Sequence, residues 1–339
     1  FDTKEIENLI YQKKVLITGC GGSIGSELVR QIIRMNPKKL ILIDNTEFNL
    51  YNIQLEIQKI NKDKKLKIEI VYCLNNICDK SKIEEIFKNH SPNYVYHAAA
   101  YKHVPLLEFN IPSAVENNVL GTYNLVSLSE KYEVNHFTLI SSDKAVRPTN
   151  IMGATKRFSE LITQAYSTKS KDTKFSVVRF GNVLGSTGSV FPLFRRQIND
   201  GGPVTVTHPD VSRFFMTINE AVGLILQSTI FTKGGEVFVL NMGEPIKIID
   251  LAKKMIKLSG KTIKNKKDLN GDIEIKYIGL REGEKIFEEI FIGNKIQNTD
   301  HKDILKANED FLEFEHIKNE ITKIDNMVKQ NNASEIVEI

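Results

Sequence analysis

The segment "SSDKAVRPTNIMGATKR" at residues 141–157 places three groups that can exchange protons next to one another in sequence. They are the hydroxyl of Ser142, the carboxyl of Asp143 and the amine of Lys144. A positioned acid and a positioned base beside a hydroxyl are suited to general acid–base catalysis. The alternative is a surface ion pair between Asp143 and Lys144, and the surrounding motif favours catalysis over it.

A second lysine follows in the same segment. Lys156 comes four residues after Met152, so a helix that begins near Ile151 puts both side chains on one face. An exposed helical lysine is the alternative for Lys156. The thioether of Met152 can pack against a ligand but cannot take a proton, so a proton released beside it must go to another group.

Short apolar, β-branched runs alternate with segments of helical period, and they must position these side chains. The runs cover residues 14–19, 39–44, 68–73, 94–99, 136–141 and 175–180. This alternation predicts an α/β fold, a doubly wound parallel sheet of the Rossmann type with helices on both faces. Ser142 and its neighbours follow the fifth run, at the carboxyl end of a strand, where such sheets bind ligands.

In the second half of the chain, turn and loop signals are spaced less regularly. We expect residues 1–180 to form a nucleotide-binding domain and residues 181–339 a smaller, mixed substrate-binding region. The two regions can interleave. We also expect an apolar helix near residues 218–231, within the smaller region.

A glycine-rich loop follows the first predicted strand. The segment "TGCGGSIG" (18–25) opens a helix that continues through "SELVRQIIRM". Gly19 permits a tight turn, Gly22 lets the backbone approach a pyrophosphate, and Gly25 lets helix and strand pack closely. A plain turn is the alternative, but the strand before the loop and the helix after it favour dinucleotide binding.

Asp44 ends the second predicted strand, about 20 residues after Gly25. A carboxylate at this place accepts hydrogen bonds from both ribose hydroxyls of the cofactor and repels a 2′-phosphate. The residues that follow, "NTEFNLY", contain no Arg or Lys to bind such a phosphate. The sequence therefore predicts NAD rather than NADP, with a helix cap by Asp44 or Asn45 as the alternative.

Composition excludes several classes of protein. The 339 residues are 41% hydrophobic and 26% charged, which is enough to bury a sizeable core. The net charge is only +4, and the basic runs lack interleaved aromatic residues, so we expect no nucleic-acid partner. Three cysteines without a CxxC pair are typical of a reducing compartment and predict no metal site. Because no apolar run approaches ~18 residues, we expect no membrane contact from this chain itself.

Several motifs together carry a family resemblance. They are "TGCGGSIG", "HAAAYKHVPLLE", "ENNVLGTYN", "SSDKAVRPTNIMGATKR", "RFGNVLGSTGSVFPLF" and "GLREGEKIFEE". Over nearly its whole length the chain resembles extended short-chain dehydrogenases/reductases that act on nucleotide sugars. More narrowly, it is similar to bacterial UDP-N-acetylglucosamine 4,6-dehydratases. The resemblance implies a lyase that oxidises carbon 4 with NAD, eliminates water across carbons 5 and 6, and returns the hydride to carbon 6.

Met152 separates two branches of that family. One branch carries Tyr at this position and inverts carbon 5, whereas the other carries Met and retains the configuration there. The second branch joins its catalytic domain to an N-terminal membrane-spanning region, as in the N-glycosylation enzyme of Campylobacter-like bacteria. Met152 therefore implies retention, a role in protein glycosylation or polysaccharide synthesis, and a possible upstream anchor at the cytoplasmic side of the bacterial inner membrane.

The resemblance also implies roles for the reactive residues. Asp143 would protonate the departing 6-hydroxyl, Lys144 would remove the proton at carbon 5, Ser142 would bind the 4-hydroxyl, and Lys156 would bind the nicotinamide ribose. For the proton of the 4-hydroxyl, Asp143 is our first candidate and a water held by Ser142 and Lys156 the second. Because a base must be neutral, we expect burial and nearby positive charge to lower the pKa of Lys144.

Further residues are predicted to bind the ligands. Those for the cofactor are Gly19, Gly22, Ser23, Ile24, Gly25, Asp44, Asn76, Ile77, Ala98, Ala99 and Lys156. Those for the substrate, UDP-N-acetylglucosamine, are Lys102, His103, Asn182, Arg195, Arg281 and Glu284. Asn182 and Arg281 resemble the family's diphosphate contacts, and Glu284 its contact to the uridine ribose. A solvated helix-start charge is the alternative for Glu284, and structural loop roles are the alternatives for Lys102 and His103.

Two other functions stay open from the sequence. A nucleotide-sugar 4-epimerase would share the fold but would not need the Asp143 and Lys144 pair, and it normally uses the missing Tyr. A non-catalytic NAD-binding regulator would explain Met152 but would leave the nucleotide-sugar motifs without a purpose. Because folds of this kind usually associate through helices, we expect a homodimer.

Overall fold

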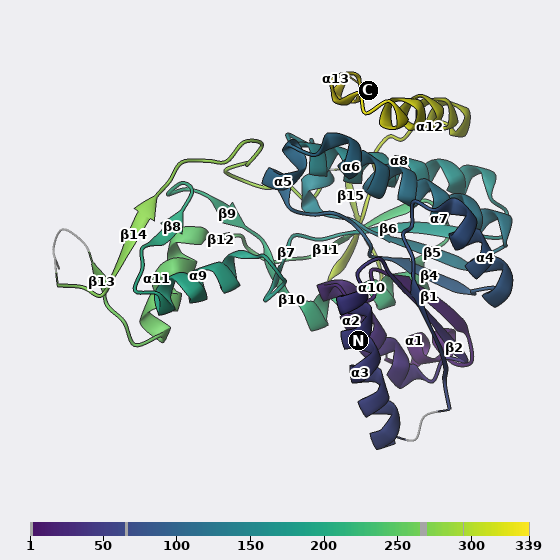
Figure 1. Cartoon of the computed structure of the whole chain (residues 1–339), viewed down its shortest axis with the longest axis horizontal. Helices are drawn as coiled ribbons and strands as arrows, with labels where there is room; N and C mark the ends of the chain where they lie inside the picture. Colours follow the sequence, from purple (N-terminus) through teal and green to yellow (C-terminus); the bar gives the residue numbers. More distant parts are fainter. Residues whose placement is uncertain (1–2, 65–66, 265–269, 294, 339) are drawn as a thin grey trace.

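The computed structural model describes residues 3–64, 67–264, 270–293 and 295–338 (Figure 1). Its largest feature is a nine-stranded sheet in the order β15-β16-β11-β6-β5-β4-β1-β2-β3. The strands are β1 (Lys14–Thr18), β2 (Lys39–Asp44), β3 (Glu69–Leu74), β4 (Tyr94–His97), β5 (His136–Ile140), β6 (Lys174–Arg179), β11 (Glu236–Leu240), β15 (Ile296–Asn298) and β16 (Ile304–Ala307). Every neighbouring pair from β3 to β11 is parallel, and β16 and β15 complete the edge in antiparallel pairing.

Helices cover both faces of this sheet. One face carries α1 (Thr3–Ile10), α2 (Ser23–Ile32), α3 (Glu47–Lys64) and α10 (Ile218–Phe231). The other carries α4 (Lys80–His90), α7 (Gly121–Lys131), α8 (Ile151–Lys169) and α12 (Phe314–Lys329) (Figure 1). Because helices bury both faces, strand residues such as Val15, Leu16 and Ile17 are apolar and fully buried. The prediction of a doubly wound, Rossmann-type sheet is confirmed.

The six strands expected from the sequence are β1 to β6, with ends moved by at most two residues. The apolar helix expected near 218–231 is α10, with these bounds. Its predicted place is wrong, however, because α10 packs on the large sheet beside α1 and α2 and not in the smaller region. A helix that is apolar on most of its surface needs cover on several sides, and the sheet and its neighbouring helices supply that cover.

A smaller region lies beside the carboxyl ends of the parallel strands (Figure 1). It contains α9 (Val190–Asn199), α11 (Ile248–Leu258), and a sheet of β8 (Val204–Val206), β13 (Ile263–Lys264) and β14 (Ile273–Tyr277). Its separate core includes Phe194, Val204, Ile256 and Ile273. Two small strand pairs complete this part: β7 (Asn182–Leu184) with β10 (Phe215–Thr217), and β9 (Ser212–Arg213) with β12 (Ile246–Lys247).

Short helices connect these layers. They are η1 (Ile33–Met35), α5 (Val104–Glu108), α6 (Ile111–Val115), the π-helix η2 (Glu116–Leu120), η3 (Asp143–Ala145) and α13 (Ala333–Val337). The large sheet takes β11, β15, β16 and two helices from beyond residue 180, so the two predicted regions interleave in space. The division into a cofactor domain and a substrate region stays a prediction.

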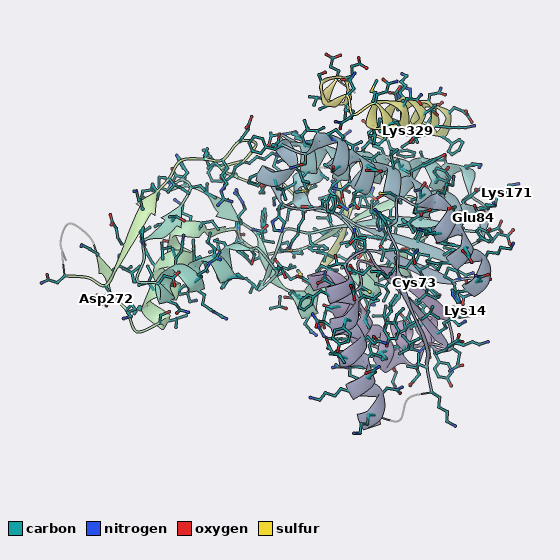
Figure 2. The ribbon with its side chains drawn as sticks, viewed as in Figure 1. Lys14, Cys73, Glu84, Lys171, Asp272 and Lys329 are labelled. Atoms are coloured by element: carbon teal, nitrogen blue, oxygen red, sulfur yellow. The ribbon has the colours of Figure 1, made fainter. Side chains whose placement is uncertain are left out.

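Charged side chains such as Lys171 and Lys329 lie on the outside of the helical layer, whereas Cys73 lies at the sheet (Figure 2). All three cysteines are free thiols. Burial raises the pKa of Cys73 to about 11 and that of Cys78 to about 12, so both stay protonated and unreactive near neutral pH. Among the described residues, no group of three or more potential ligands forms a metal cluster, and no helix has the length and hydropathy of a membrane span.

Candidate active site

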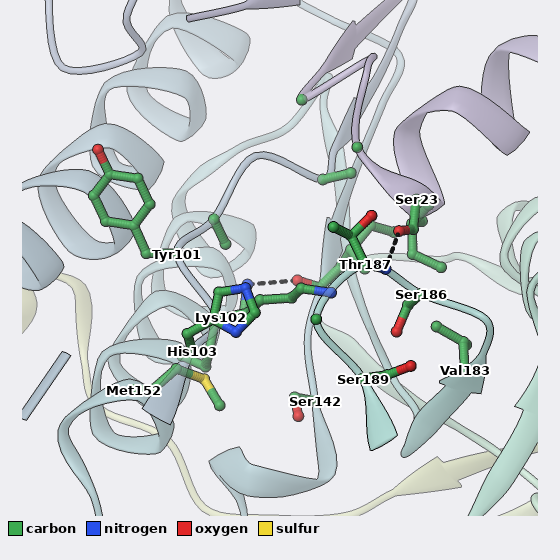
Figure 3. A pocket seen from close by; sticks show the side chains of 18 of the residues that line it. Ser23, Tyr101, Lys102, His103, Ser142, Met152, Val183, Ser186, Thr187 and Ser189 are labelled. Carbon is green, nitrogen blue, oxygen red and sulfur yellow. Dashed lines mark hydrogen bonds between the residues drawn. The ribbon is translucent and has the colours of Figure 1, made fainter. Parts of the chain in front are cut away.

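A cavity of about 780 Å³ opens at the carboxyl ends of β1, β4, β5 and β6. Figure 3 shows Lys102, His103 and Met152 gathered on one side of it, and Ser186, Thr187 and Ser189 on another. The predicted site residues that line it are Gly19, Gly22, Ser23, Ile24, Gly25, Ala98, Lys102, His103, Ser142, Lys144, Met152, Lys156 and Asn182. One cavity therefore collects the glycine-rich loop and most of the residues expected to react.

A second cavity of about 220 Å³ adjoins the first, since both are lined by Gly19, Gly22 and Ala98. Asp44, Ile77 and Ala99 line this smaller cavity as well. The two spaces together run from the acid at the end of β2, past the glycine-rich loop, to the residues that follow β5.

The glycines of the loop have conformations that side chains would prevent. Gly19 has a φ of +63°, and a Cβ there would lie 2.8 Å from the backbone of Ala99. A Cβ at Gly25 would overlap the carbonyl oxygen of Gly19. Gly22 forms the N-cap of α2 and faces the cavity, which leaves the first amides of the helix open to an anion.

Asp44 is held in place by two backbone amides. Its Oδ2 accepts a hydrogen bond from Gly21 N and its Oδ1 one from Thr46 N, both at 2.9 Å. The side chain is buried, and each oxygen keeps a second lone pair for a ligand. The hydrogen bond from Thr46 N is a local capping contact of the kind expected as the alternative role of Asp44. It is compatible with ribose binding by the same carboxylate. Gly21 was not predicted from the sequence, because a fourth glycine in the loop gives no sign that its amide binds the acid.

Met152 lies in the first turn of α8, which begins at the predicted residue, Ile151. The helix is capped by Asn150, whose Oδ1 accepts a hydrogen bond from Gly153 N at 2.8 Å. The Met152 side chain packs with Leu107 and Ala114 and contributes to the cavity wall. It forms an apolar surface there and supplies no proton acceptor.

Lys156 lies one turn further along α8 and also lines the cavity. Its Nζ donates a hydrogen bond to the carbonyl oxygen of Ile140 at 2.6 Å. Burial lowers the pKa of Lys156 to about 8, although the charge of Glu160 acts in the opposite direction. Lys156 therefore stays largely protonated at neutral pH and places a positive charge beside the cavity.

Ser142, Asp143 and Lys144 form a connected set at the start of η3. Ser142 Oγ donates a hydrogen bond to Asp143 Oδ1 at 2.9 Å, and Lys144 Nζ donates to the same oxygen at 3.0 Å. Lys144 Nζ also lies 3.4 Å from Asn182 Oδ1. Because Asp143 is fully buried, the alternative of a surface ion pair is wrong.

Asp143 does not itself line the cavity. Its Oδ2 is buried and has no hydrogen-bond partner among the described residues. A Cβ added to Gly181, which does line the cavity, would lie 3.2 Å from this oxygen. Asp143 thus lies directly behind the cavity wall, and Ser142 Oγ and Lys144 Nζ connect it to the space in front.

The charge state of Lys144 differs from the expectation. Burial by itself lowers the pKa of this amine, as predicted, but the charges of Asp143 and then Glu288 outweigh burial and raise the pKa above its ordinary value. The sequence interpretation was wrong in this respect because it included cations near Lys144 and overlooked a second carboxylate. Among the groups of the protein alone, Lys144 is an ammonium.

Other predicted residues lie outside both cavities. Asn76 Oδ1 accepts a hydrogen bond from Cys78 N, and Arg195 and Arg281 are exposed. Glu284 accepts hydrogen bonds from Thr207 Oγ1 at 3.0 Å and from Arg213 at 3.2 Å. These four residues therefore line neither cavity.

Further residues complete the site and were missed. Asn118, in the π-helix, accepts a hydrogen bond from Tyr101 N at 2.8 Å and donates one to Thr155 Oγ1 at 3.0 Å, which ties the loop after β4 to α8. Thr187 N donates to Ser23 Oγ at 3.3 Å across the cavity mouth (Figure 3). A π-helix at a functional site has precedent, but a sequence offers no signal for it.

The chain is similar to known proteins over most of its length. The family model described as "Polysaccharide biosynthesis protein" matches residues 15–309. The capsular polysaccharide biosynthesis protein CapD of Staphylococcus aureus is 48% identical over 295 residues, which cover 87% of this chain and 48% of that protein. The chain thus spans about half the length of this relative. A UDP-glucose 4-epimerase of Rickettsia rickettsii (strain Sheila Smith) is 32% identical, covering 86% of this chain and 81% of that protein.

Solved structures share the fold. The X-ray structure of Pen from Bacillus thuringiensis matches with a TM-score of 0.78 at 32% identity, covering 93% of this chain and 99% of that one. DesIV, a dTDP-glucose 4,6-dehydratase from Streptomyces venezuelae with NAD and TYD bound, matches with a TM-score of 0.67 at 19% identity, covering 82% and 88%. The match over most of its length shows that the chain belongs to the polysaccharide biosynthesis protein family of extended short-chain dehydrogenases/reductases.

Proposed function

We propose that this chain catalyses the NAD-dependent dehydration of UDP-N-acetylglucosamine. The product is the 4-keto-6-deoxy sugar nucleotide, UDP-2-acetamido-2,6-dideoxy-α-D-xylo-hexos-4-ulose, with retained configuration at carbon 5. The observation that carries the proposal is the connected set of Ser142, Asp143 and Lys144 at the cavity wall, beside an apolar Met152. The similarity to CapD, a capsular polysaccharide biosynthesis protein, and the fold shared with DesIV, a dTDP-glucose 4,6-dehydratase, support the proposal.

The cofactor site fits NAD. Gly22 faces the cavity without a side chain at the N-terminus of α2, where a pyrophosphate can approach the amides. Asp44 lies in the adjoining cavity with its carboxylate fixed by two amides, ready to accept from ribose hydroxyls and to repel a 2′-phosphate. When bound, NAD supplies the hydride acceptor for carbon 4 and the hydride donor for carbon 6.

Four proton movements remain for the residues of the chain: from the 4-hydroxyl, from carbon 5, to the 6-hydroxyl, and back to carbon 5. Ser142 Oγ faces the cavity and is the hydroxyl that is hydrogen-bonded to Asp143, so the proton of the 4-hydroxyl passes through Ser142 to the Asp143 carboxylate. Lys144, once deprotonated, removes the proton at carbon 5, and Asp143 returns its proton through Ser142 to the departing 6-hydroxyl. After the hydride has reached carbon 6, Lys144 returns its proton to carbon 5 from the same face, which retains the configuration there. Met152 keeps this part of the cavity apolar, and the Lys156 ammonium lies where the nicotinamide ribose is expected.

The nucleotide end of the substrate extends toward the smaller region. Asn182, one of the two residues predicted to contact the diphosphate, lines the cavity and contacts Lys144. The exposed guanidinium groups of Arg195 and Arg281 remain predictions for the same role. The homodimer and the membrane anchor upstream of this chain also remain predictions.

Epimerisation at carbon 4 is the rival function, and a 32% identical UDP-glucose 4-epimerase favours it. An epimerase needs a proton acceptor at the 4-hydroxyl, but it needs no further acid and base to eliminate water. The buried Asp143 and Lys144 contact therefore favours dehydration.

Incubation of the purified protein with UDP-N-acetylglucosamine, followed by mass spectrometry, separates these functions. Dehydration gives a sugar nucleotide lighter by one water molecule. A product of unchanged mass but altered sugar identity would establish the epimerase, and absence of turnover would support a non-catalytic NAD-binding protein. A Lys144→Ala variant is the control, because it should bind NAD but form no dehydrated product.

A further inference from the structure

Glu288 reaches the reactive residues from a distant part of the sequence. Its side chain is 4% exposed, and its Oε1 lies 3.7 Å from Lys144 Nζ. The next residue, Glu289, points the other way: its side chain is 42% exposed and its Oε1 lies 3.2 Å from Arg147. Two adjacent glutamates thus occupy opposite environments, and only the first belongs to the buried cluster.

Glu288 also faces Arg213, whose Nε lies 3.9 Å from Glu288 Oε1. The Arg213 guanidinium donates hydrogen bonds to the carbonyl oxygens of Ile286 and Lys285, at 3.1 Å and 2.8 Å. Lys285 Nζ in turn donates to Val146 O, close to η3. These contacts fix the backbone on the N-terminal side of Glu288. The fixed backbone, and not the ion pair alone, therefore directs the Glu288 carboxylate at Lys144.

The cluster holds two carboxylates, each with an unpartnered oxygen. Asp143 Oδ2 and Glu288 Oε2 are both buried and have no hydrogen-bond partner among the described residues. Burial raises the pKa of Glu288; Lys144 opposes this shift and Asp143 adds to it. The groups that face Glu288 are therefore Lys144, Asp143, Arg213 and Lys285, and Lys144 is the nearest cation.

We propose that Glu288 is a positioning residue for Lys144, because its carboxylate and that of Asp143 hold the Lys144 ammonium between them. This second carboxylate decides how readily Lys144 gives up its proton. The inference rests on the proposed function, in which neutral Lys144 is the base at carbon 5. Glu288, on the segment after β14, thus controls the protonation of Lys144, the base on the segment after β5.

The first test measures the protonation of Lys144 without using the reaction. Trace acetic anhydride acetylates only neutral amines, so the rate of Lys144 labelling over a range of pH, read by peptide mass spectrometry, reports its titration. Glu288→Gln and Glu288→Met both remove the charge. We expect either folded variant to label Lys144 about three to ten times faster at a fixed pH, which corresponds to a pKa lowered by roughly a half to one unit.

Two controls separate charge from packing. Glu289→Gln removes the adjacent carboxylate, and we expect its Lys144 labelling to equal that of the wild type. Glu288→Asp keeps the charge at a changed distance, and we expect labelling close to the wild type. Unchanged labelling of the buried Lys156 shows that a variant is folded. Equal Lys144 rates in the wild type and the folded neutral variants, or a fast rate in Glu288→Asp, would overturn the proposal.

The second test uses turnover of UDP-N-acetylglucosamine. Because neutral Lys144 is the active form, the low-pH limb of kcat should move to lower pH in Glu288→Gln, while KM changes less than about twofold. A lower kcat with an unmoved profile would show a merely structural role and would contradict the proposal. If the wild type forms no dehydrated product, the proposed function fails, but the labelling result still decides the role of Glu288.

Discussion

The cofactor loop and the acid–base cluster are built in different ways. The cofactor site uses the glycine-rich loop and Asp44 from one βαβ unit, and backbone amides hold the Asp44 carboxylate. The cluster combines η3 with Arg213 and with Glu288, far along the chain, and side-chain charges hold it together. Local backbone geometry thus specifies the first region. Burial of opposed charges specifies the second, so single changes there should have larger effects.

The largest effect is expected in the acid–base cluster. Asp143→Asn removes the carboxylate that both Ser142 and Lys144 contact, and Lys144→Ala removes the proposed base. Each variant should lose ~10²-fold or more of kcat, as is usual for a positioned acid or base. Steady-state assay of the dehydrated product measures the loss, and NAD titration is the control, since cofactor affinity should be nearly unchanged. Near-native kcat in either variant would remove that residue from the mechanism.

In the cofactor site, Asp44→Ala should weaken NAD binding and relax the choice between NAD and NADP. Loss of hydrogen bonds to a charged group costs about 1.5–3 kcal/mol, which corresponds to a Kd of NAD raised by about tenfold or more. Calorimetric titration with both cofactors measures this. We expect purified wild-type protein to carry NAD, and recovery of NADP as its main bound nucleotide would contradict the role of Asp44.

Most of the fold was predictable from the sequence, and the cofactor loop with it, because glycine spacing and strand periodicity act locally. Strands β1 to β6 and the start of α8 follow from such patterns. The place of α10 was not predictable, since an apolar helix signals burial without naming its partner. Neither was Glu288, because "EE" at 288–289 does not show which carboxylate turns inward. The predicted direction of the Lys144 pKa shift was wrong, because the charges of Asp143 and then of the unforeseen Glu288 outweigh burial.

A smaller effect is expected for Lys156, and it concerns the free energy of unfolding. Its pKa is about 8 in the folded chain, below the ordinary value of 10.5, so folding is opposed by burial of its charge. That cost is absent above pH 10.5 and is complete below about pH 8, so stability from this group rises with pH in that window. Relative to Lys156→Met, cofactor-free wild-type protein should gain about 1–3 kcal/mol of unfolding free energy from pH 8 to pH 10.5.

Urea denaturation of both proteins across this pH range tests the effect. Groups that titrate in both proteins cancel in the difference between them. A difference that stays constant with pH would show that Lys156 is not buried as a charge.

The smallest effect is expected at Met152. If Asp143 has taken over the proton of the 4-hydroxyl through Ser142, a phenol at this position has no task to perform. Met152→Tyr should then leave kcat unchanged or lower it a few-fold by crowding the apolar wall formed with Leu107 and Ala114. Product assays over a range of pH check this. A several-fold gain in kcat would show that the site is an impaired ordinary dehydrogenase.

The most direct test of the proposed dehydration uses UDP-N-acetylglucosamine that carries deuterium at carbon 4. Dehydration with internal return of the hydride moves that deuterium to carbon 6, in a product lighter by one water molecule. Proton NMR and mass spectrometry of the product locate the label and report the configuration at carbon 5. We predict deuterium at carbon 6 with carbon 5 retained. Deuterium that remains at carbon 4 in a product of unchanged mass would contradict the account and establish epimerisation.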